Sequence, residues 1–255
     1  MTRIYQSDDV SLWRCYQITD CHLVADADGS YQGIKPFRHL QKLLARLKPY
    51  PLILTGDLTQ DHSEASYQLL ADLLKEWPAP VFYVPGNHDD PAMMAKVFHA
   101  PAISSGPFSC AEEIWAAGWQ LLLLSTKGES PAGSFSQDKL AELANRLDAQ
   151  PSRPAWLFCH HHPKPIGSSI DEHGLVESAE FCQLLDNRPK VKGLAHGHCH
   201  YAYHQVQDSW QIVGCPASSV QFKLAAEWLT EDQGPQACLW QFALDQPAQW
   251  EFVVV

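Results

Sequence analysis

The sequence predicts an α/β fold in which β-sheets are layered between helices, with a β-rich C-terminal part. Short apolar runs of strand length alternate with amphipathic helical segments as far as Ala195. From Tyr203 onward this alternation stops, and short runs of apolar and aromatic residues follow one another between turn residues. No linker or internal repeat interrupts the chain, so we expect one domain that spans residues 1–255.

The first half of the chain is expected to form three strand–helix units. Each strand is a short apolar and β-branched run that ends at a polar loop. Leu40, Leu43 and Leu44 form the apolar face of the first helix, and Asp61 with Glu64 fits a capping box before the second. The expected strands cover residues 14–19, 51–55 and 81–84, and the expected helices cover residues 36–48, 63–77 and 91–99.

The second half is expected to add three similar strands and then the β-rich part. Leu140, Leu143 and Leu147 lie on one face of a helix that Ser136 caps. A further helix is expected at residues 178–186. The expected strands cover residues 120–124, 155–159 and 191–195, followed by 203–207, 210–214, 218–223, 237–244 and 250–255.

Composition and hydropathy indicate which class of partner and which cellular compartment to expect. The formal net charge of −11 argues against a nucleic-acid polymer as a partner, but it permits a small phosphate ligand held by metal ions. The N-terminal residues lack an apolar signal core, and no apolar run is long enough to cross a membrane, so we expect a cytoplasmic protein. The eight cysteines lack the CxxC spacing of a structural zinc site, so we expect reduced thiols.

Polar clusters follow five of the expected strands, at the point where each strand ends. Because ligands of open α/β sheets bind at the carboxyl ends of the strands, we expect these clusters to meet at one end of a sheet. Carboxylate, amide and imidazole donors in this mixture suit first-row metals such as iron, manganese or zinc. The clusters are Asp20 with His22, Asp57, Asn87 with His88, His160, and His198 with His200.

Two of the clusters have one residue between their donors. In a locally extended chain, residues two apart lie on one face, so Asp20 with His22, and His198 with His200, would point the same way. The intervening Cys21 would then point away from the metal, and so would Cys199.

Six short motifs carry a resemblance to a known family, and the similarity runs from about residue 14 to residue 223. The motifs are QITDCHL, TGDLTQD, VPGNHD, HHHPKP, GHCH and SSVQFK. Together they resemble the calcineurin-like metallophosphoesterases, and within them the bacterial 3′,5′-cyclic AMP phosphodiesterases of class III. The resemblance implies a layered α/β/β/α sandwich that holds two divalent metal ions, with Fe²⁺ or Mn²⁺ favoured and Zn²⁺ as an alternative.

The resemblance also implies a role for each residue of the clusters. Asp20, His22 and His200 would hold one metal ion, whereas Asn87, His160 and His198 would hold the other. Asp57 would bridge both ions. His88 would bind no metal and would act as the general acid that protonates the leaving 3′-oxygen. The residues implied to contact the substrate are His22, Asp57, Asn87, His88 and His200.

Two assignments stay open at this stage. A gapless match of HHHPKP to the family pattern makes His160 the ligand, and His161 is the alternative. The side chain that orients His88 is either Gln60 or Asp61.

The sequence therefore predicts a metal-dependent phosphodiesterase that opens 3′,5′-cyclic AMP to 5′-AMP through attack of a metal-bound hydroxide. The alternatives are another phosphodiester substrate, such as a glycerophosphodiester or a 2′,3′-cyclic nucleotide, or a non-catalytic interaction module that keeps the fold. Substrate choice is expected to depend on the loop at residues 171–177 and the turn at residues 217–219. The partner is a small molecule, and the oligomeric state is left open.

Overall fold

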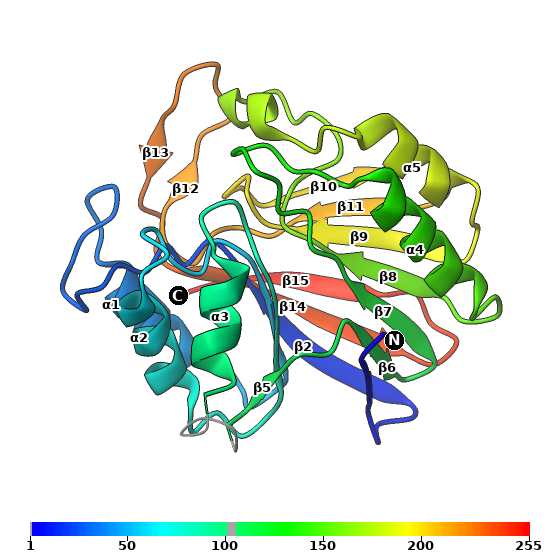
Figure 1. The fold of residues 1–255 in the computed structure, drawn as a ribbon, viewed down its shortest axis with the longest axis horizontal. Coiled ribbons are helices and arrows are strands. Elements are labelled where there is room, and N and C mark those ends of the chain that lie inside the picture. Colours follow the sequence, from blue (N-terminus) through cyan, green and yellow to red (C-terminus); the bar gives the residue numbers. More distant parts are fainter. Residues whose placement is uncertain (1, 101–105) are drawn as a thin grey trace.

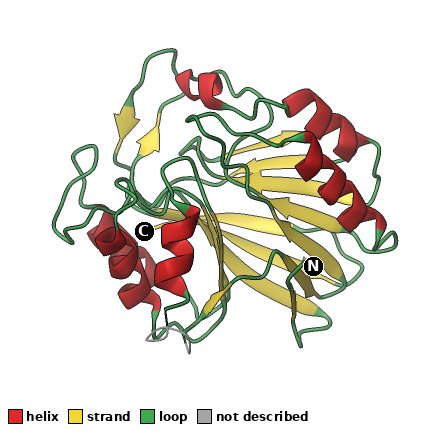
Figure 2. Ribbon diagram, in the orientation of Figure 1, coloured by secondary structure: helices red, strands yellow, loops and turns green. Residues whose placement is uncertain are grey.

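Two β-sheets lie face to face between two groups of helices, which gives the chain four layers (Figure 1). The computed structural model describes residues 2–100 and 106–255. Helices α1, α2 and α3 cover the outer side of one sheet, and α4 and α5 cover the outer side of the other (Figure 2). Each helix packs apolar residues against its sheet, so the outer face of each sheet is covered.

The first sheet has six strands among the described residues, in the order β15-β14-β2-β3-β4-β5. Strands β2 to β5 run parallel, and β14 pairs antiparallel with both β2 and β15. Four parallel strands therefore end at the same edge of this sheet. Its strands are β2 (Leu12–Ile18), β3 (Leu52–Thr55), β4 (Val81–Val84), β5 (Phe108–Ser109), β14 (Gln236–Ala243) and β15 (Gln249–Val254).

The second sheet has seven strands in the described part of the chain, in the order β1-β6-β7-β8-β9-β11-β10. Strands β7, β8, β9 and β11 form its parallel centre. A small two-stranded ribbon of β12 (Gln221–Phe222) and β13 (Thr230–Glu231) stands apart from both sheets. The strands of the second sheet are β1 (Ile4–Gln6), β6 (Glu113–Ala116), β7 (Trp119–Leu123), β8 (Ala155–Phe158), β9 (Val191–His196), β10 (Tyr203–Val206) and β11 (Gln211–Gly214).

Five α-helices lie within the described residues, and side chains cap the first turn of three of them. Asp90 caps α3 by accepting the backbone N–H groups of Ala92 and Met93, and Ser136 caps α4 by accepting that of Lys139. None of the described helices is long and apolar enough to cross a membrane. The helices are α1 (Pro36–Leu44), α2 (Glu64–Leu74), α3 (Pro91–Phe98), α4 (Gln137–Asp148) and α5 (Ser178–Asp186), and a 3₁₀ helix, η1, covers Ser169–His173.

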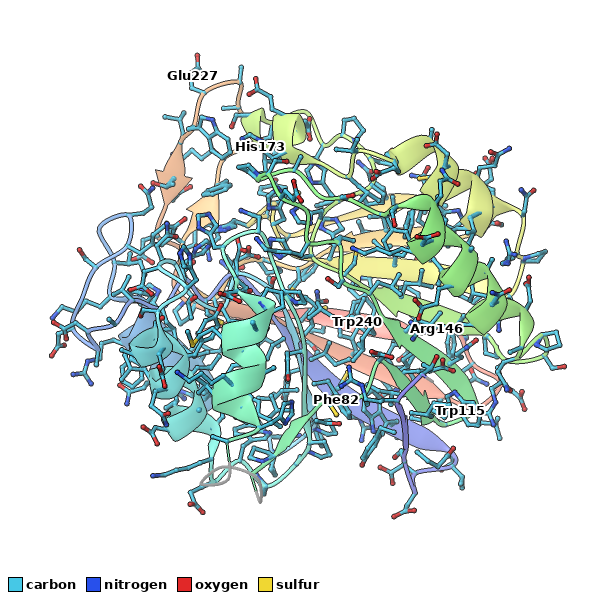
Figure 3. The ribbon with its side chains drawn as sticks, in the orientation of Figure 1. Phe82, Trp115, Arg146, His173, Glu227 and Trp240 are labelled. Atoms are coloured by element: carbon cyan, nitrogen blue, oxygen red, sulfur yellow. The ribbon has the colours of Figure 1, made fainter. Side chains whose placement is uncertain are left out.

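Large aromatic side chains fill the space between the two sheets. Trp156 of the second sheet and Trp240 of the first have ring centroids 5.0 Å apart, and Phe158 meets Trp240 edge-on at 5.6 Å. Figure 3 shows Trp240 and Phe82 inside the sandwich. Such rings bury large apolar areas in fixed geometries, so the two sheets are held firmly against each other.

The predicted α/β sandwich is confirmed, and the structure corrects details within it. The β-rich tail divides, because β10 and β11 extend the second sheet whereas β14 and β15 extend the first. Strands β1, β5, β6 and β13 were not predicted, and β1, β5 and β13 have only two or three residues each. The capping-box prediction was wrong: Ser63 caps α2 by accepting the backbone N–H of Ser66.

Candidate metal centre

The polar clusters meet at the seam between the two sheets. The loops after β2, β3 and β4 of the first sheet carry Asp20, Asp57 and Asn87, and the loops after β8 and β9 of the second carry His160 and His198. The prediction that the clusters share one end of a single sheet was therefore wrong, although all of them follow parallel strands. The donors converge because the two sheets pack with these strand ends adjacent (Figure 1).

The backbone at these clusters is not extended. Asp20, His22 and Asp57 have φ angles of 52°, 46° and 50°, and His198 and His200 have φ angles of 64° and 50°. The expectation of a locally extended chain was thus wrong, because these values fall in the left-handed region. Such residues are costly outside glycine and concentrate at functional sites.

Side-chain and backbone contacts keep the cysteines away from the donors, as expected. The hydroxyl of Ser218 donates to Sγ of Cys21 at 3.3 Å, which holds that thiol in the interior. Cys21 and Cys199 are both buried, and neither belongs to a group of candidate metal-binding side chains in the described residues.

One set of donors surrounds His200. Its Nε2 lies 3.3 Å from Oδ1 of Asp20 and 3.1 Å from Nε2 of His22. Nε2 of His22 in turn lies 3.7 Å from Oδ2 of Asp57. Three imidazole and carboxylate side chains, Asp20, His22 and His200, therefore present ligand atoms to one small volume, with Asp57 beside it.

A second set of donors surrounds His160. Its Nε2 lies 3.4 Å from Oδ1 of Asp57 and 3.1 Å from Oδ1 of Asn87. The ring of His198 lies edge-on to it, with centroids 5.0 Å apart. The two carboxylate oxygens of Asp57 thus face different histidines, one from each set, so this side chain stands between the two groups of donors.

In three of these histidines, the ring nitrogen on the side away from the other donors has a hydrogen-bond acceptor. Nδ1 of His22 donates to Oε1 of Gln60 at 2.7 Å. Nδ1 of His160 donates to the carbonyl oxygen of Thr55 at 2.8 Å, and Nδ1 of His200 donates to that of Val220 at 2.6 Å. Outer-shell acceptors of this kind orient a metal-binding imidazole and leave its other nitrogen as the donor. In these three rings that nitrogen is Nε2.

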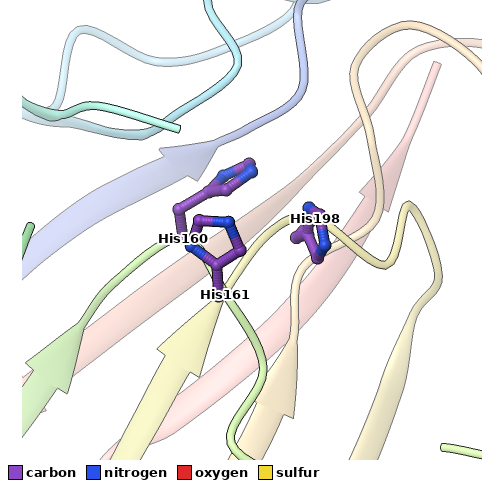
Figure 4. A group of neighbouring side chains, drawn as sticks. All are labelled: His160, His161 and His198. Atoms are coloured by element: carbon purple, nitrogen blue, oxygen red, sulfur yellow. The ribbon is translucent and has the colours of Figure 1, made fainter. Parts of the chain in front are cut away.

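The neighbouring histidines of the HHH motif differ from His160. Thr126 Oγ1 lies 2.8 Å from Nδ1 of His161, and Nε2 of His161 donates to the carbonyl oxygen of Pro131 at 3.2 Å. Both nitrogens of His161 are thereby engaged. His162 Nε2 contacts Asp171 at 3.2 Å, away from Asp57. Figure 4 shows the rings of His160, His161 and His198 gathered at the strand ends.

Electrostatics favour a positive charge at the centre. Burial alone would lower the pKa of His160, but the adjacent Asp57 carboxylate raises it to about 9. Burial lowers the pKa of His22 to about 3, so that ring is neutral and able to bind a metal. Two buried carboxylates, Asp20 and Asp57, need a compensating charge, and a metal ion supplies it as well as a proton does.

Neither predicted orienter contacts the His88 ring. Gln60 holds His22 instead, and Asp61 accepts the hydroxyl of Ser66 at 2.7 Å near the start of α2. The backbone N–H of His88 donates to Oδ1 of Asp57 at 2.8 Å, and its ring lies edge-on to that of His22 at 5.1 Å. The pairing of His88 with Gln60 or Asp61 was therefore wrong.

Sequence reasoning gave no role to Asp89, which joins two of the loops. Its carboxylate accepts the backbone N–H groups of Leu58 and Gly86 at 3.1 and 2.9 Å, and the hydroxyl of Tyr67 at 3.0 Å. Burial raises its pKa to about 6, with Asp57 adding to the effect. The available signal was the fourth residue of the GNHD motif, an acid on a buried loop.

A pocket of about 420 Å³ opens onto the donors. The residues that line it include no lysine or arginine, so the charge of a bound phosphate must be met by histidines or by metal ions. All five residues predicted to contact substrate line this pocket: His22, Asp57, Asn87, His88 and His200.

Of the two segments expected to govern substrate choice, only one lines the pocket. His173, from the loop at residues 171–177, lines the pocket. The turn at residues 217–219 is buried and lies outside the pocket lining, and the hydroxyl of Ser219 donates to the carbonyl oxygen of Asp20 at 2.6 Å. This turn therefore supports the Asp20 loop. Sequence reasoning missed Tyr31, Phe222 and Trp228, which also line the pocket. The available signal for Phe222 was its place in the SSVQFK motif.

The four-layered fold and the buried His and Asp clusters define the class of protein, because such clusters are consistent with the dimetal site of a metallophosphoesterase. The chain matches the model of the calcineurin-like phosphoesterase family over residues 14–202. It belongs to that family, as its motifs predict.

Relatives extend over most of the chain. A probable cyclic nucleotide phosphodiesterase of Pseudoalteromonas sp. is 40% identical over 227 residues, which cover 87% of this chain and 84% of the relative. A 3′,5′-cyclic adenosine monophosphate phosphodiesterase of Vibrio vulnificus is 35% identical over 215 residues, which cover 81% of this chain and 77% of the relative. A solved dimetal phosphatase of Danio rerio shares the fold, with a TM-score of 0.69 at 14% identity over 96% of each chain.

Proposed function

We propose that this chain is a dinuclear-metal phosphodiesterase that hydrolyses 3′,5′-cyclic AMP to 5′-AMP. The observation that carries the proposal is the position of Asp57, whose Oδ1 faces His160 and whose Oδ2 faces His22. A carboxylate placed in this way divides the buried donors into two sets that share one member. The names of the relatives from Pseudoalteromonas and Vibrio support a cyclic nucleotide as the substrate.

The donor sets fit two divalent ions. Asp20, His22 and His200 would hold one ion, Asp57 would bridge, and the remaining ligands, Asn87, His160 and His198, would hold the other. His198 Nε2 donates to the carbonyl oxygen of His173 at 3.1 Å, so Nδ1 is the nitrogen that this ring would offer. When bound, two ions such as Fe²⁺, Mn²⁺ or Zn²⁺ would polarise the phosphoryl oxygens and activate water for in-line attack.

The protein's own contribution is orientation and proton transfer. Lys127 Nζ donates to the carbonyl oxygen of Asn87 at 2.7 Å, and the backbone N–H of His88 is fixed by Asp57, so this loop holds its two side chains in place. The His88 ring lines the pocket, and a ligand atom of it lies within 4.8 Å of ligand atoms of His22 and Asp57, but we assign it to neither ion. As the bond between phosphorus and the 3′-oxygen breaks, the His88 imidazolium would give that oxygen its proton, and a proton from the attacking water would return to the ring.

The pocket suits a small phosphodiester. Its volume of about 420 Å³ falls in the range of small-molecule sites. The net charge of −11 opposes a long polyanion, because only the small region around the donors would carry the positive charge of the ions.

The direct test is metal-dependent hydrolysis by the purified chain. Metal content should be close to two ions per chain, chelation should abolish hydrolysis of 3′,5′-cyclic AMP, and Mn²⁺ or Fe²⁺ should restore it. Assays of 2′,3′-cyclic AMP and glycerophosphocholine run beside it, and kcat/KM should be highest for 3′,5′-cyclic AMP. Full activity in a metal-free preparation would overturn the two-metal assignment, and a higher kcat/KM for another diester would overturn the substrate.

A further inference from the structure

We propose that Trp228, with Phe222 beside it, is the platform on which the nucleobase of the substrate stacks. This inference rests on the proposed function, and it adds a specificity-determining residue outside the family's motifs. Trp228 lines the same pocket as the donors, yet 51% of its surface is exposed. A tryptophan left this open beside a polar site is unusual for a core residue and typical of a binding surface.

The platform continues outward from the metal centre ring by ring. Phe222 stacks on His200, with centroids 4.0 Å apart and planes 7° apart. Trp228 meets Phe222 edge-on at a centroid distance of 5.5 Å and an angle of 89°. Two ring-to-ring steps therefore separate a donor that would hold the phosphate end from an open indole.

The indole is held in place by its surroundings. Its ring stacks against His173 at a centroid distance of 6.0 Å, and the backbone N–H of Ser169 donates to the carbonyl oxygen of Ala225 at 2.9 Å, which ties η1 to the loop that carries Trp228. Figure 3 shows His173 beside this loop, whose tip carries Glu227. The carbonyl oxygen of His173 also binds His198, so the platform has a fixed relation to the donors. Pre-organisation of this kind lowers the entropic cost of binding a flat ligand.

The chemistry of the pocket favours a neutral aromatic ring over a cation. An aromatic wall also suits a quaternary ammonium group, such as that of glycerophosphocholine. The only acidic residue in the pocket lining is Asp57, and its carboxylate faces His22 and His160. No carboxylate of the lining is thus directed to the Trp228 end, whereas base–aromatic stacking needs none.

The test compares Trp228→Ala with Trp228→Phe and with Leu229→Ala, which removes an equally exposed apolar side chain next to Trp228 but outside the pocket lining. The substrates are 3′,5′-cyclic AMP and ribose 3′,5′-cyclic phosphate, which lacks the base. Binding of adenosine, which lacks the phosphate, is followed by ligand-observed NMR, so one measurement is independent of turnover and of the metal ions.

We expect Trp228→Ala to raise KM for cyclic AMP and Kd for adenosine roughly 5- to 100-fold, the range that base–aromatic stacking supports. KM for the base-free substrate should change far less, Trp228→Phe should keep most of the affinity, and Leu229→Ala should match the unmodified chain. Equal losses on both cyclic substrates would make Trp228 a structural support of η1 and overturn the platform. So would an unchanged Kd for adenosine, or a loss of affinity for glycerophosphocholine in place of adenosine.

The two proposals fail in different ways. If the unmodified chain hydrolyses cyclic AMP and Trp228→Ala has no effect, only the platform is wrong. If the unmodified chain hydrolyses neither cyclic substrate but Trp228→Ala loses adenosine binding, the proposed reaction is wrong and the platform stands. If the unmodified chain neither hydrolyses the cyclic substrates nor binds adenosine, both proposals are overturned.

Discussion

The two sheets contribute different chemistry to the centre that lies between them. Asp20, Asp57 and Asn87, which offer every oxygen donor of the proposed set, follow strands of the first sheet. The second sheet offers imidazoles, from His160 and from the loop after β9. One half therefore carries the negative charge, and the other supplies nitrogen donors. Neither sheet holds a complete site, so the centre exists only when the sandwich is assembled.

Close backbone approach makes this joint site possible. Gly56 has a φ of 91°, and a Cβ placed on it would lie 2.6 Å from Nδ1 of His160 on the other sheet. On the second sheet, a Cβ on Gly197 would collide with the Thr19 side chain. At these two points a glycine of one sheet thus packs directly against a side chain of the other. Metal ions bound here would link the sheets, so metal binding and stability should be coupled.

Among the substitutions on the first sheet, Asp57→Ala should cause the largest loss of metal binding and turnover. The change removes the only side chain whose oxygens face both donor sets, so both ions should be lost and turnover of cyclic AMP should fall below detection. Metal content by mass spectrometry and turnover are measured on the same sample. Asp28→Ala, which removes an exposed acid paired with Lys35 and Arg38, is the matched control and should keep both. Retention of two ions by Asp57→Ala would contradict the bridging role.

On the second sheet, His160→Ala should cause the largest loss of metal binding. Its Nε2 faces Asp57 and Asn87, so its loss should weaken metal binding by more than the roughly 10–100-fold typical of outer-shell changes. His161→Ala and His162→Ala are controls from the same motif and should cost less, because their ring nitrogens contact other groups. Metal titration of the three variants ranks them. If His161→Ala proves the most damaging, the assignment of His160 is wrong by one residue.

The donors could be predicted from the sequence because each follows a strand directly. A short apolar run fixes where a strand ends, and the next few polar residues are then placed at the sheet edge whatever the rest of the fold does. Asp57 after residues 51–55 and Asn87 after residues 81–84 are such cases. The choice between His160 and His161 depends on which ring reaches Asp57 across the seam, which the pattern of strands does not encode.

Features that depend on distant contacts could not be predicted. The division of the clusters between two sheets is set by how β8 and β9 pack against β2 and β3, which local periodicity does not encode. The left-handed conformation of Asp20 is held by a hydrogen bond from its backbone N–H to the carbonyl oxygen of Gly56. Trp228 belongs to the pocket only because the loop between β12 and β13 folds against η1.

His88→Ala should sharpen the comparison, since His88 lies on the first sheet but outside the proposed donor sets. Both metal ions should remain, while turnover of cyclic AMP falls on the order of 10²–10⁴-fold because the leaving oxygen loses its proton donor. The fall should be smaller for bis(nitrophenyl) phosphate, whose leaving group barely needs a proton. Turnover on both substrates is measured with metal content on the same samples. An equal fall on both would make His88 a phosphate-positioning group, and loss of metal would make it part of the metal centre.

Gln60 and Asp61 are neighbours on the loop after β3. Their substitutions should have the smallest effects, one on metal affinity and the other on stability. Gln60→Ala removes the acceptor that orients His22, so the affinity for one ion should fall about 10–100-fold, and Gln60→Glu, which keeps an acceptor, should restore most of it. Asp61→Ala should leave metal affinity unchanged and lower the free energy of unfolding by about 1 kcal/mol, because the start of α2 loses the acceptor of Ser63 and Ser66. Metal titration and urea unfolding of the three variants measure these effects. Should Gln60→Ala instead keep both ions and reproduce the substrate-dependent fall of His88→Ala, Gln60 would act on His88, the pairing that the sequence alone suggested.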